Sequence, residues 1–349
     1  MSHLTRRSAL YGLGVLAVSH LAHNAAAASA DPLSVQGNVT DQFVGPLSGI
    51  TIHTSDAHAY RRFLQGGMGM SQGPLVTSRL GRRYGLDQDT MAIRTYLGPD
   101  ASSAPINVRI IEGASPSTSI LRPDHDALLP GAMSIGFPVS EIEARAKILA
   151  AYGFPATAGV TDITLPRADG TTYKVFESHH RAPDGVLCLC IDRADLKPVG
   201  LIDAAGLGIG GPAYSGMIVT DAAAMERMLV GVFGWQKRRD VVLSSSGPNG
   251  GLGLPAGQRF IFQQYFAPGT DTGYLVIMQH LMNQRPVPPK LGLAQRGLGM
   301  LSFGSRRLND VIVRARAHNI AILAAPTRAA GRSVIFATPD GVPMEVMQT

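Results

Sequence analysis

One carboxylate near the end of the chain stands where an isolated acid can do chemistry. Glu345 lies in the otherwise apolar stretch 344–347, after a Pro-Asp-Gly turn sequence at 339–341 and a β-branched and aromatic stretch at 334–336. Asp and Gly tolerate the backbone angles of a tight hairpin, so this pattern predicts strand, turn, strand. Successive strand residues point to opposite faces, which puts Glu345 on the face of Met347. Such an acid is either a rim residue or a cavity carboxylate that acts as a metal ligand or general base.

Two further side chains are candidates to work with Glu345. His280 ends a predicted strand at 274–279 and shares the face of Glu345 in one of two registers, so Glu345 with His280 is the candidate metal-binding pair. Tyr214, just before the strand that leads to Asp221, is a candidate phenol ligand or proton donor. The candidate catalytic residues are therefore Glu345, Tyr214 and His280. The competing interpretations are a salt-bridged or neutral acid, a core tyrosine with its hydroxyl bonded to backbone, and an exposed histidine at a strand end.

Three other histidines carry weaker expectations. His53 shares strand parity with Gly49, and we consider it together with Lys174 as a pair that binds an anion or moves a proton, or alternatively as a core histidine. His179 and His180 precede a Pro-Asp-Gly turn, and we assign them to a surface loop.

The elements that must position these residues follow a repeated strand–helix–strands pattern. Marker residues recur roughly 170 residues later in the chain, which is the signature of an internal repeat. The recurring pairs are Asp56 with Asp221, Met133 with Met300, and Asp169-Gly170 with Asp340-Gly341. The pattern predicts four similar units in two halves, one at 31–195 and one at 213–349, joined by a glycine-rich linker at 196–212.

A family resemblance rests on three motifs. These are Ile-Val-Thr-Asp at 218–221 before a helix, Gly-Trp at 234–235 at its end, and the closing segment 331–345. The chain resembles the vicinal-oxygen-chelate (VOC) superfamily of glyoxalases, bleomycin-resistance proteins and extradiol dioxygenases. The resemblance implies an α+β fold of tandem VOC domains, each of two paired βαβββ units whose curled mixed sheets surround a cavity.

The resemblance also implies where a metal would bind. In metal-binding members, two first-strand residues, often histidines, and hairpin glutamates converge on one ion. The matching first-strand positions are Gly49, Tyr214 and Met300, and the other hairpin positions are Lys174 and either Val276 or Ile277. Only Glu345 retains a ligand, so the resemblance implies a degenerate metal site in which a divalent Fe, Mn, Zn or Ni is disfavoured.

Composition and targeting signals limit the possible partners and cellular locations of the protein. The chain has 349 residues and a net charge of +6, without a basic stripe, so we do not expect nucleic-acid binding. Residues 1–30 carry twin arginines at 6–7, an apolar run and a small-residue cleavage site, as in a twin-arginine-type signal peptide. That run is too short to span a membrane, and the expected location is periplasmic or secreted. Cys188 and Cys190 are expected to be free core residues.

Three functions are compatible with the sequence. The first is an exported VOC-superfamily protein that acts on a small oxygenated or aromatic molecule, as a lyase, isomerase or dioxygenase. The second is a non-catalytic protein that binds and sequesters a small molecule, which the loss of ligand positions favours. The third is an interaction module whose cavities are filled by methionine and leucine. Oligomer formation is compatible with each of them, and fold alone does not choose between enzyme and binding protein.

Overall fold

The computed structural model describes residues 42–98, 106–166, 171–193, 211–247, 251–282, 292–327 and 332–349. The predicted signal segment lies outside these ranges, as do most of the predicted linker and Asp169-Gly170. No helix in the described ranges is long and apolar enough to cross a membrane.

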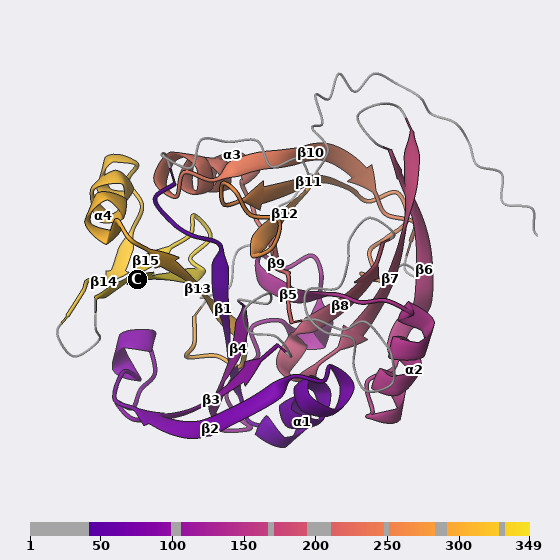
Figure 1. Cartoon of the computed structure of the whole chain (residues 1–349), viewed down its shortest axis with the longest axis horizontal. Coiled ribbons are helices and arrows are strands. Elements are labelled where there is room, and N and C mark those ends of the chain that lie inside the picture. The colour runs from indigo at the N-terminus through magenta and orange to yellow at the C-terminus, as the bar shows by residue number, and fades with distance from the viewer. Residues whose placement is uncertain are drawn as a thin grey trace, which may run out of the picture.

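Four units of one pattern follow each other along the chain (Figure 1). The first comprises β1 (Leu47–Thr54), α1 (Ala57–Arg61), the π-helical turn η2 (Arg62–Gly67), β2 (Ser71–Ser78), β3 (Met91–Leu97) and β4 (Asn107–Glu112). The second comprises β5 (Gly131–Pro138), α2 (Ile142–Ala151), β6 (Ala156–Pro166), β7 (Thr172–Arg181) and β8 (Leu187–Asp192). The third comprises β9 (Tyr214–Ile218), α3 (Ala222–Glu226), the π-helical turn η6 (Arg227–Val232), β10 (Gln236–Ser244), β11 (Arg259–Phe266) and β12 (Tyr274–His280). The fourth comprises β13 (Gly297–Ser305), α4 (Leu308–Ala317), β14 (Ile322–Ala324), β15 (Ser333–Ala337) and β16 (Pro343–Gln348).

Aspartates start the helices of the first and third units in the same way. The Asp56 carboxylate accepts a hydrogen bond from the amide of Ala59 at 2.8 Å, and Asp221 accepts one from Ala224 at 3.0 Å. Each aspartate thus satisfies an amide that has no partner within the helix. Three short 3₁₀ turns complete the described elements: η3 (Arg82–Tyr84), η4 (Pro123–His125) and η5 (Pro183–Gly185).

The units pair into two eight-stranded mixed sheets, but not in chain order. Sheet A has the order β14-β15-β16-β13-β1-β4-β3-β2 and joins the fourth unit to the first. Sheet C has the order β10-β11-β12-β9-β5-β8-β7-β6 and joins the third unit to the second. In each sheet the first strands of two units meet antiparallel, β1 with β13 and β5 with β9. The α+β fold of paired βαβββ units is confirmed, and each sheet takes one unit from either side of the predicted linker.

One large core joins the two sheets. It contains Ile50 and Ile52 of β1, Phe137 of β5 and Phe303 of β13, each with no exposed surface. The turn η2 packs against α2, and the turn η6 packs against α4, on either side of the four central strands (Figure 1). The opposite face of each sheet carries a smaller cluster of its own. Strand alternation therefore divides each central strand between a shared core and a concave face.

Matched polar contacts tie each unit to its neighbour in the chain. The Thr54 hydroxyl at the end of β1 donates to Asp184 of the Pro-Asp-Gly turn between β7 and β8 at 2.5 Å. The Thr220 hydroxyl, beyond the end of β9, donates to Asp340 in the corresponding turn between β15 and β16. Each contact crosses from one sheet to the other. The equivalent of the turn at 339–341 is thus the turn at 183–185, and not Asp169-Gly170 as the repeat spacing predicted.

Two expectations about buried residues have different outcomes. Cys188 and Cys190 are free and buried, as expected. The surface loop predicted for His179 and His180 is wrong: both residues lie in β7, with exposures of 4% and 0%. The strand continues to Arg181, so the turn signal at 183–185 follows it directly.

Candidate functional site

Strand register defines one row of four positions across the middle of each concave face. In sheet A, Gly49 lies beside Asn107 and opposite Ser302, and Ser302 lies beside Glu345. In sheet C, Gly136 lies beside Leu189 and opposite Tyr214, and Tyr214 lies beside Tyr274. Each row contains two first-strand and two last-strand residues, which is the arrangement that the family resemblance assigns to metal ligands.

The rows correct three positions inferred from the repeat. Gly49 and Tyr214 do occupy first-strand positions, but Ser302 rather than Met300 faces Gly49. Met300 lies two residues earlier on the same face of β13, where it pairs with Thr51.

The hairpin positions change as well. Leu189 replaces Lys174, since the turn that precedes the last strand of the second unit is at 183–185. Tyr274 replaces Val276 or Ile277. Lys174 lies instead on β7, with a 63% exposed side chain that pairs with Asp162 at 2.6 Å.

Glu345 is the centre of a buried polar cluster in sheet A. Its carboxylate accepts hydrogen bonds from the hydroxyls of Tyr84 at 3.0 Å, Ser333 at 3.3 Å and Ser302 at 3.3 Å. Arg109 of β4 completes the set, with its guanidinium 3.4 Å from the second carboxylate oxygen. Glu345 is 2% exposed, so its charge is compensated by these four donors in place of water.

Tyr84 comes from the connection between β2 and β3, which folds across sheet A to reach β16. The turn that carries it is anchored by Arg83, whose guanidinium donates to the carbonyls of Ala325 at 2.6 Å and Ser333 at 2.7 Å. Burial and the neighbouring charge of Glu345 raise the pKa of Tyr84 to about 12, so its hydroxyl stays protonated and acts as a donor.

Arg109 is the member of this cluster that sequence reasoning missed. It lies two residues after Asn107 on the same face of β4, and its guanidinium reaches across β1 to donate to Ser302 as well as to Glu345. Gly49 lies close beneath this row, because a Cβ at that position would lie 3.3 Å from both Oδ1 of Asn107 and Cβ of Ser302. Strand alternation places residues 107, 109 and 111 on one face of β4, and this was the available signal. The sequence of the strand did not indicate that Arg109 would pair with Glu345.

The residues around Glu345 do not fit a divalent metal. A cation would have to share the carboxylate with a guanidinium, and like charges this close repel strongly. The other members of the row are Asn107, Gly49 and Ser302, which offer neutral oxygens at most. Among the described residues, no group of three or more His, Cys, Asp or Glu side chains is placed to hold a metal ion.

Buried polar atoms without partners lie on the same face of sheet A as the Glu345 cluster. They are Oδ1 of Asn107, Nε of Arg109, Oγ1 of Thr51 and Nδ1 of His53, none of which has a hydrogen-bond partner in the described structure. Desolvation lowers the pKa of His53, which keeps its ring neutral. Because buried polar groups are normally paired, these atoms mark the sheet A face as a place where a polar ligand or water completes the bonding.

The other predicted site residues lie in the other sheet. Tyr214 is on β9 and His280 on β12, whereas Glu345 is on β16 of sheet A. His280 is 6% exposed, and its Nε2 bonds to the carbonyl of Ala127 at 2.8 Å. The fold thus does not bring together the predicted pair of Glu345 and His280. His53 and Lys174 are likewise divided between the sheets.

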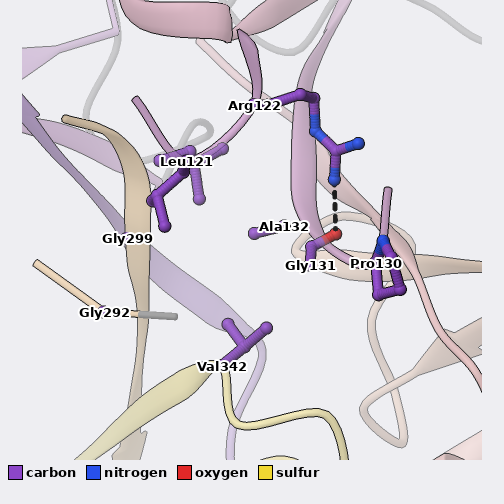
Figure 2. Close-up of a pocket in the computed structure, with 9 residues that line it drawn as sticks. Leu121, Arg122, Pro130, Gly131, Ala132, Gly292, Gly299 and Val342 are labelled. Carbon is purple, nitrogen blue, oxygen red and sulfur yellow. Dashed lines mark hydrogen bonds between the residues drawn. The ribbon is translucent and has the colours of Figure 1, made fainter. Parts of the chain in front are cut away.

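A small pocket lies between the sheets, away from both rows (Figure 2). It is lined largely by glycine and aliphatic residues, including Leu121, Ala132, Gly299 and Val342. Arg122 stands at its edge and donates to the carbonyl of Gly131 at 3.3 Å (Figure 2). Burial lowers the pKa of Arg122 to about 10. The pocket lining contains no acid and none of the predicted site residues.

Solved structures of glyoxalases share this architecture. A glyoxalase I variant from Zea mays superimposes with a TM-score of 0.58 at 13% identity, covering 89% of this chain and 95% of that one. Unmutated glyoxalase I from Zea mays gives a TM-score of 0.56 at 14% identity, covering 87% and 92%. A proposed dioxygenase from Bacillus subtilis gives 0.55 at 13% identity, covering 88% and 86%. No protein-family model and no curated protein matches the sequence. The chain has the fold of the vicinal-oxygen-chelate superfamily.

Proposed function

We propose that this protein binds a small oxygenated molecule on the concave face of sheet A, and does so without a metal ion. The observation that carries the proposal is the Arg109 guanidinium, 3.4 Å from Glu345, at the row where the family's metal would bind. The Arg109 guanidinium thereby neutralises the Glu345 carboxylate, which would otherwise attract a metal ion. With a guanidinium in place of a metal ion, the protein retains the cavity wall of the fold, but its binding site is based on hydrogen bonds.

The chemistry of the ligand follows from the surrounding groups. Unpaired Nε of Arg109 and Oδ1 of Asn107 offer one donor and one acceptor. The apolar neighbours on this face include Met300, Ile111 and Ile335, which exclude water around the polar atoms. Small-molecule sites typically combine an apolar lining with a few convergent polar groups, and a compact molecule with carbonyl or hydroxyl oxygens fits this combination.

Metal analysis and ligand binding test the proposal together. We expect protein purified without chelator, and then incubated with Fe²⁺, Mn²⁺, Zn²⁺ or Ni²⁺, to hold no stoichiometric metal at the Glu345 site. Thermal-shift screening with small hydroxy and keto acids is expected to give hits that Arg109→Met weakens. Stoichiometric metal that disappears in Glu345→Ala would refute the metal-free site. Hits whose thermal shift is unchanged in Arg109→Met would refute the proposed location of the ligand site.

A second function is favoured by the hydrogen bond between Tyr84 and Glu345. A protonated phenol 3.0 Å from a carboxylate is an acid–base pair, so a metal-free lyase or isomerase would use Tyr84 as proton donor and Glu345 as base. The oxygens of Glu345 already accept bonds from four donors within the protein, which is why we place binding first. Turnover of a screening hit that is lost in both Tyr84→Phe and Glu345→Gln would establish the enzyme.

We also propose that the protein works outside the cytoplasm. The support is the sequence of residues 1–30, with arginines at positions 6 and 7 before an apolar run. Cell fractionation of the full chain, compared with a variant carrying lysines at both positions, tests this. Cytoplasmic retention of the lysine variant is expected if the twin-arginine route is used, and unchanged export would indicate another route.

A further inference from the structure

The pocket between the two sheets lies where β5 and β13 pack against each other (Figure 2). Gly131 and Ala132 of β5 belong to its lining, as do Leu298 and Gly299 of β13. Both strands bulge at this level, with Gly299 as the extra residue against β1 and Met133 as the extra residue against β9. Because a bulge bends its strand, two equivalent bulges explain why a space remains in an otherwise close-packed junction.

The size of the pocket suits a single ion or water molecule. The space open to the centre of a water-sized sphere is about 10 Å³, which is too small for an organic ligand. The walls are glycine backbone and apolar side chains such as Leu121, Pro130 and Val342, and the lining contains no acid. A bound species must therefore be small, and it must be recognised by the polar group at the edge of the pocket.

That polar group is the guanidinium of Arg122, whose charge is buried without an acid against it. Arg122 is 3% exposed and is the one charged residue among the described residues that line the pocket. It donates to the backbone carbonyls of Asp126 and Gly131, which are neutral acceptors. The Asp126 carboxylate accepts instead from the amide of Leu128 at 2.8 Å. Arg122 forms no ion pair within the described part of the chain, and a buried charge in this state is costly.

The Nε atom of Arg122 indicates where an anion would bind. It is buried and has no hydrogen-bond partner in the described structure. In Figure 2, Nε lies on the edge of the guanidinium that faces Leu121 across the middle of the lining residues. Burial lowers the pKa of Arg122 to about 10, so the group keeps its proton at neutral pH. A buried cation with an unused donor at the edge of a pocket favours a bound anion.

We propose that this pocket is a binding site for one monatomic anion, and that chloride is the ion it takes. Nε of Arg122 donates to the ion, and the ion neutralises the guanidinium between the two sheets. Because the folded protein holds the ion and the unfolded chain does not, chloride stabilises the junction of β5 with β13. The site is separate from Glu345 and does not depend on the function proposed for sheet A.

The competing explanation is an arginine with a purely structural role. In that case Arg122 only braces the loop 123–131 through its two carbonyl partners, and a water molecule accepts from Nε. Such a site would not distinguish chloride from larger anions at equal ionic strength, because ionic screening depends on the concentration of charge and not on the size of the ion.

Thermal unfolding at constant ionic strength distinguishes the two explanations. Sodium chloride replaces sodium gluconate stepwise, since gluconate is too large for the pocket. We expect the melting temperature of the wild-type protein to rise by about 2–4 °C and to approach saturation by about 0.3 M chloride. Bromide is expected to act in the same way. Arg122→Met is expected to abolish the response, because it removes both the charge and the donor.

Arg145→Met is the matched control. Arg145 is also buried, at 2% exposure, and donates to the carbonyl of Gly67 at 2.8 Å, but it does not line the pocket. It is expected to keep the chloride response. Ala132→Val covers the case in which Arg122→Met does not fold, because it retains Arg122 and adds two methyl groups to the pocket lining. This variant is expected to lose the response.

Anomalous diffraction from wild-type crystals grown in sodium bromide locates the ion directly. We expect a bromide peak beside Nε of Arg122. Peaks at exposed arginines alone would indicate an adventitious ion only and would overturn the proposal. So would the absence of a chloride response in the wild-type protein, or a response retained in Arg122→Met or Ala132→Val. A response lost in Arg109→Met but not in Arg122→Met would assign the ion to sheet A and would overturn it as well.

Discussion

The buried pair of Arg109 and Glu345 gives the sharpest prediction about stability. Arg109→Met removes the guanidinium, keeps much of the side-chain volume, and leaves Glu345 charged with only three hydroxyl donors. At 3.4 Å and an effective dielectric constant of about 20, the lost attraction is about 5 kcal/mol. The Arg109 side chain is 17% exposed and the hydroxyls remain, which reduces the expected loss of unfolding free energy to about 3 kcal/mol.

A double-mutant cycle separates this charge effect from lost packing. The double variant Arg109→Met with Glu345→Gln removes both charges, so we expect it to lose only about 1 kcal/mol and to be more stable than Arg109→Met alone. Urea unfolding at neutral pH measures all four proteins, with equal slopes required for a valid comparison. Additive losses in the two single variants would refute the conclusion that Arg109 compensates the charge of Glu345.

The neighbouring pair of Arg94 and Glu112 provides a matched control. It lies in the same sheet with a shorter separation of 2.8 Å, but its side chains are 22% and 23% exposed. Water already compensates both charges, so Arg94→Met is expected to cost less than about 1 kcal/mol. A loss as large as that of Arg109→Met would show that burial is not the reason for the large contribution of the Arg109–Glu345 pair.

Three other predictions concern the stability of the fold. Thr54→Val and Thr220→Val each remove a hydroxyl that bonds to a turn aspartate of the other sheet. Each is expected to lower the free energy of unfolding in urea by about 1–2 kcal/mol. A loss in only one of the two variants would contradict their equivalence. Gly136→Ala is expected to cost about 1–3 kcal/mol by overlap with the Tyr214 ring, and Tyr214→Leu in the same chain should restore part of it; full stability of the single variant would refute the overlap. Burial lowers the pKa of His180 below 6.5, so the unfolded chain binds more protons and stability falls as pH decreases through 6.5. His180→Gln should flatten this dependence between pH 7.5 and 5, and an unchanged slope would contradict it.

Local sequence patterns predicted the elements well because short-range physics determines them. Asp56 and Asp221 precede their helices and cap them through their own side chains, which requires no tertiary information. The strand alternation that put Glu345 on one face was equally local. The error at His179 arose where a turn signal followed a strand closely, and the sequence pattern ended the strand too early.

The candidate sites could not be assembled in this way. Their members come from strands that are distant in the chain, such as those of Arg109 and Glu345, and strand pairing decides which positions lie side by side. The repeat spacing matched Met300 with the first-strand positions, and only the pairing of β1 with β13 identified Ser302 instead. The same spacing could not reveal that Tyr214 and His280 lie in a different sheet from Glu345.

The sequence by itself determined four βαβββ units, the α+β class, the resemblance to the VOC superfamily, and the survival of one acid among the positions that bind metal in that family. These features depend on residue type and local periodicity. Only the tertiary structure decided that the first unit pairs with the fourth and the second with the third. That pairing brings Arg109 onto Glu345 and leaves Tyr214 stacked on Tyr274 in the other sheet. The physical reason is that edge-to-edge strand pairing and charge compensation act between segments far apart in sequence, so no local pattern specifies which groups meet.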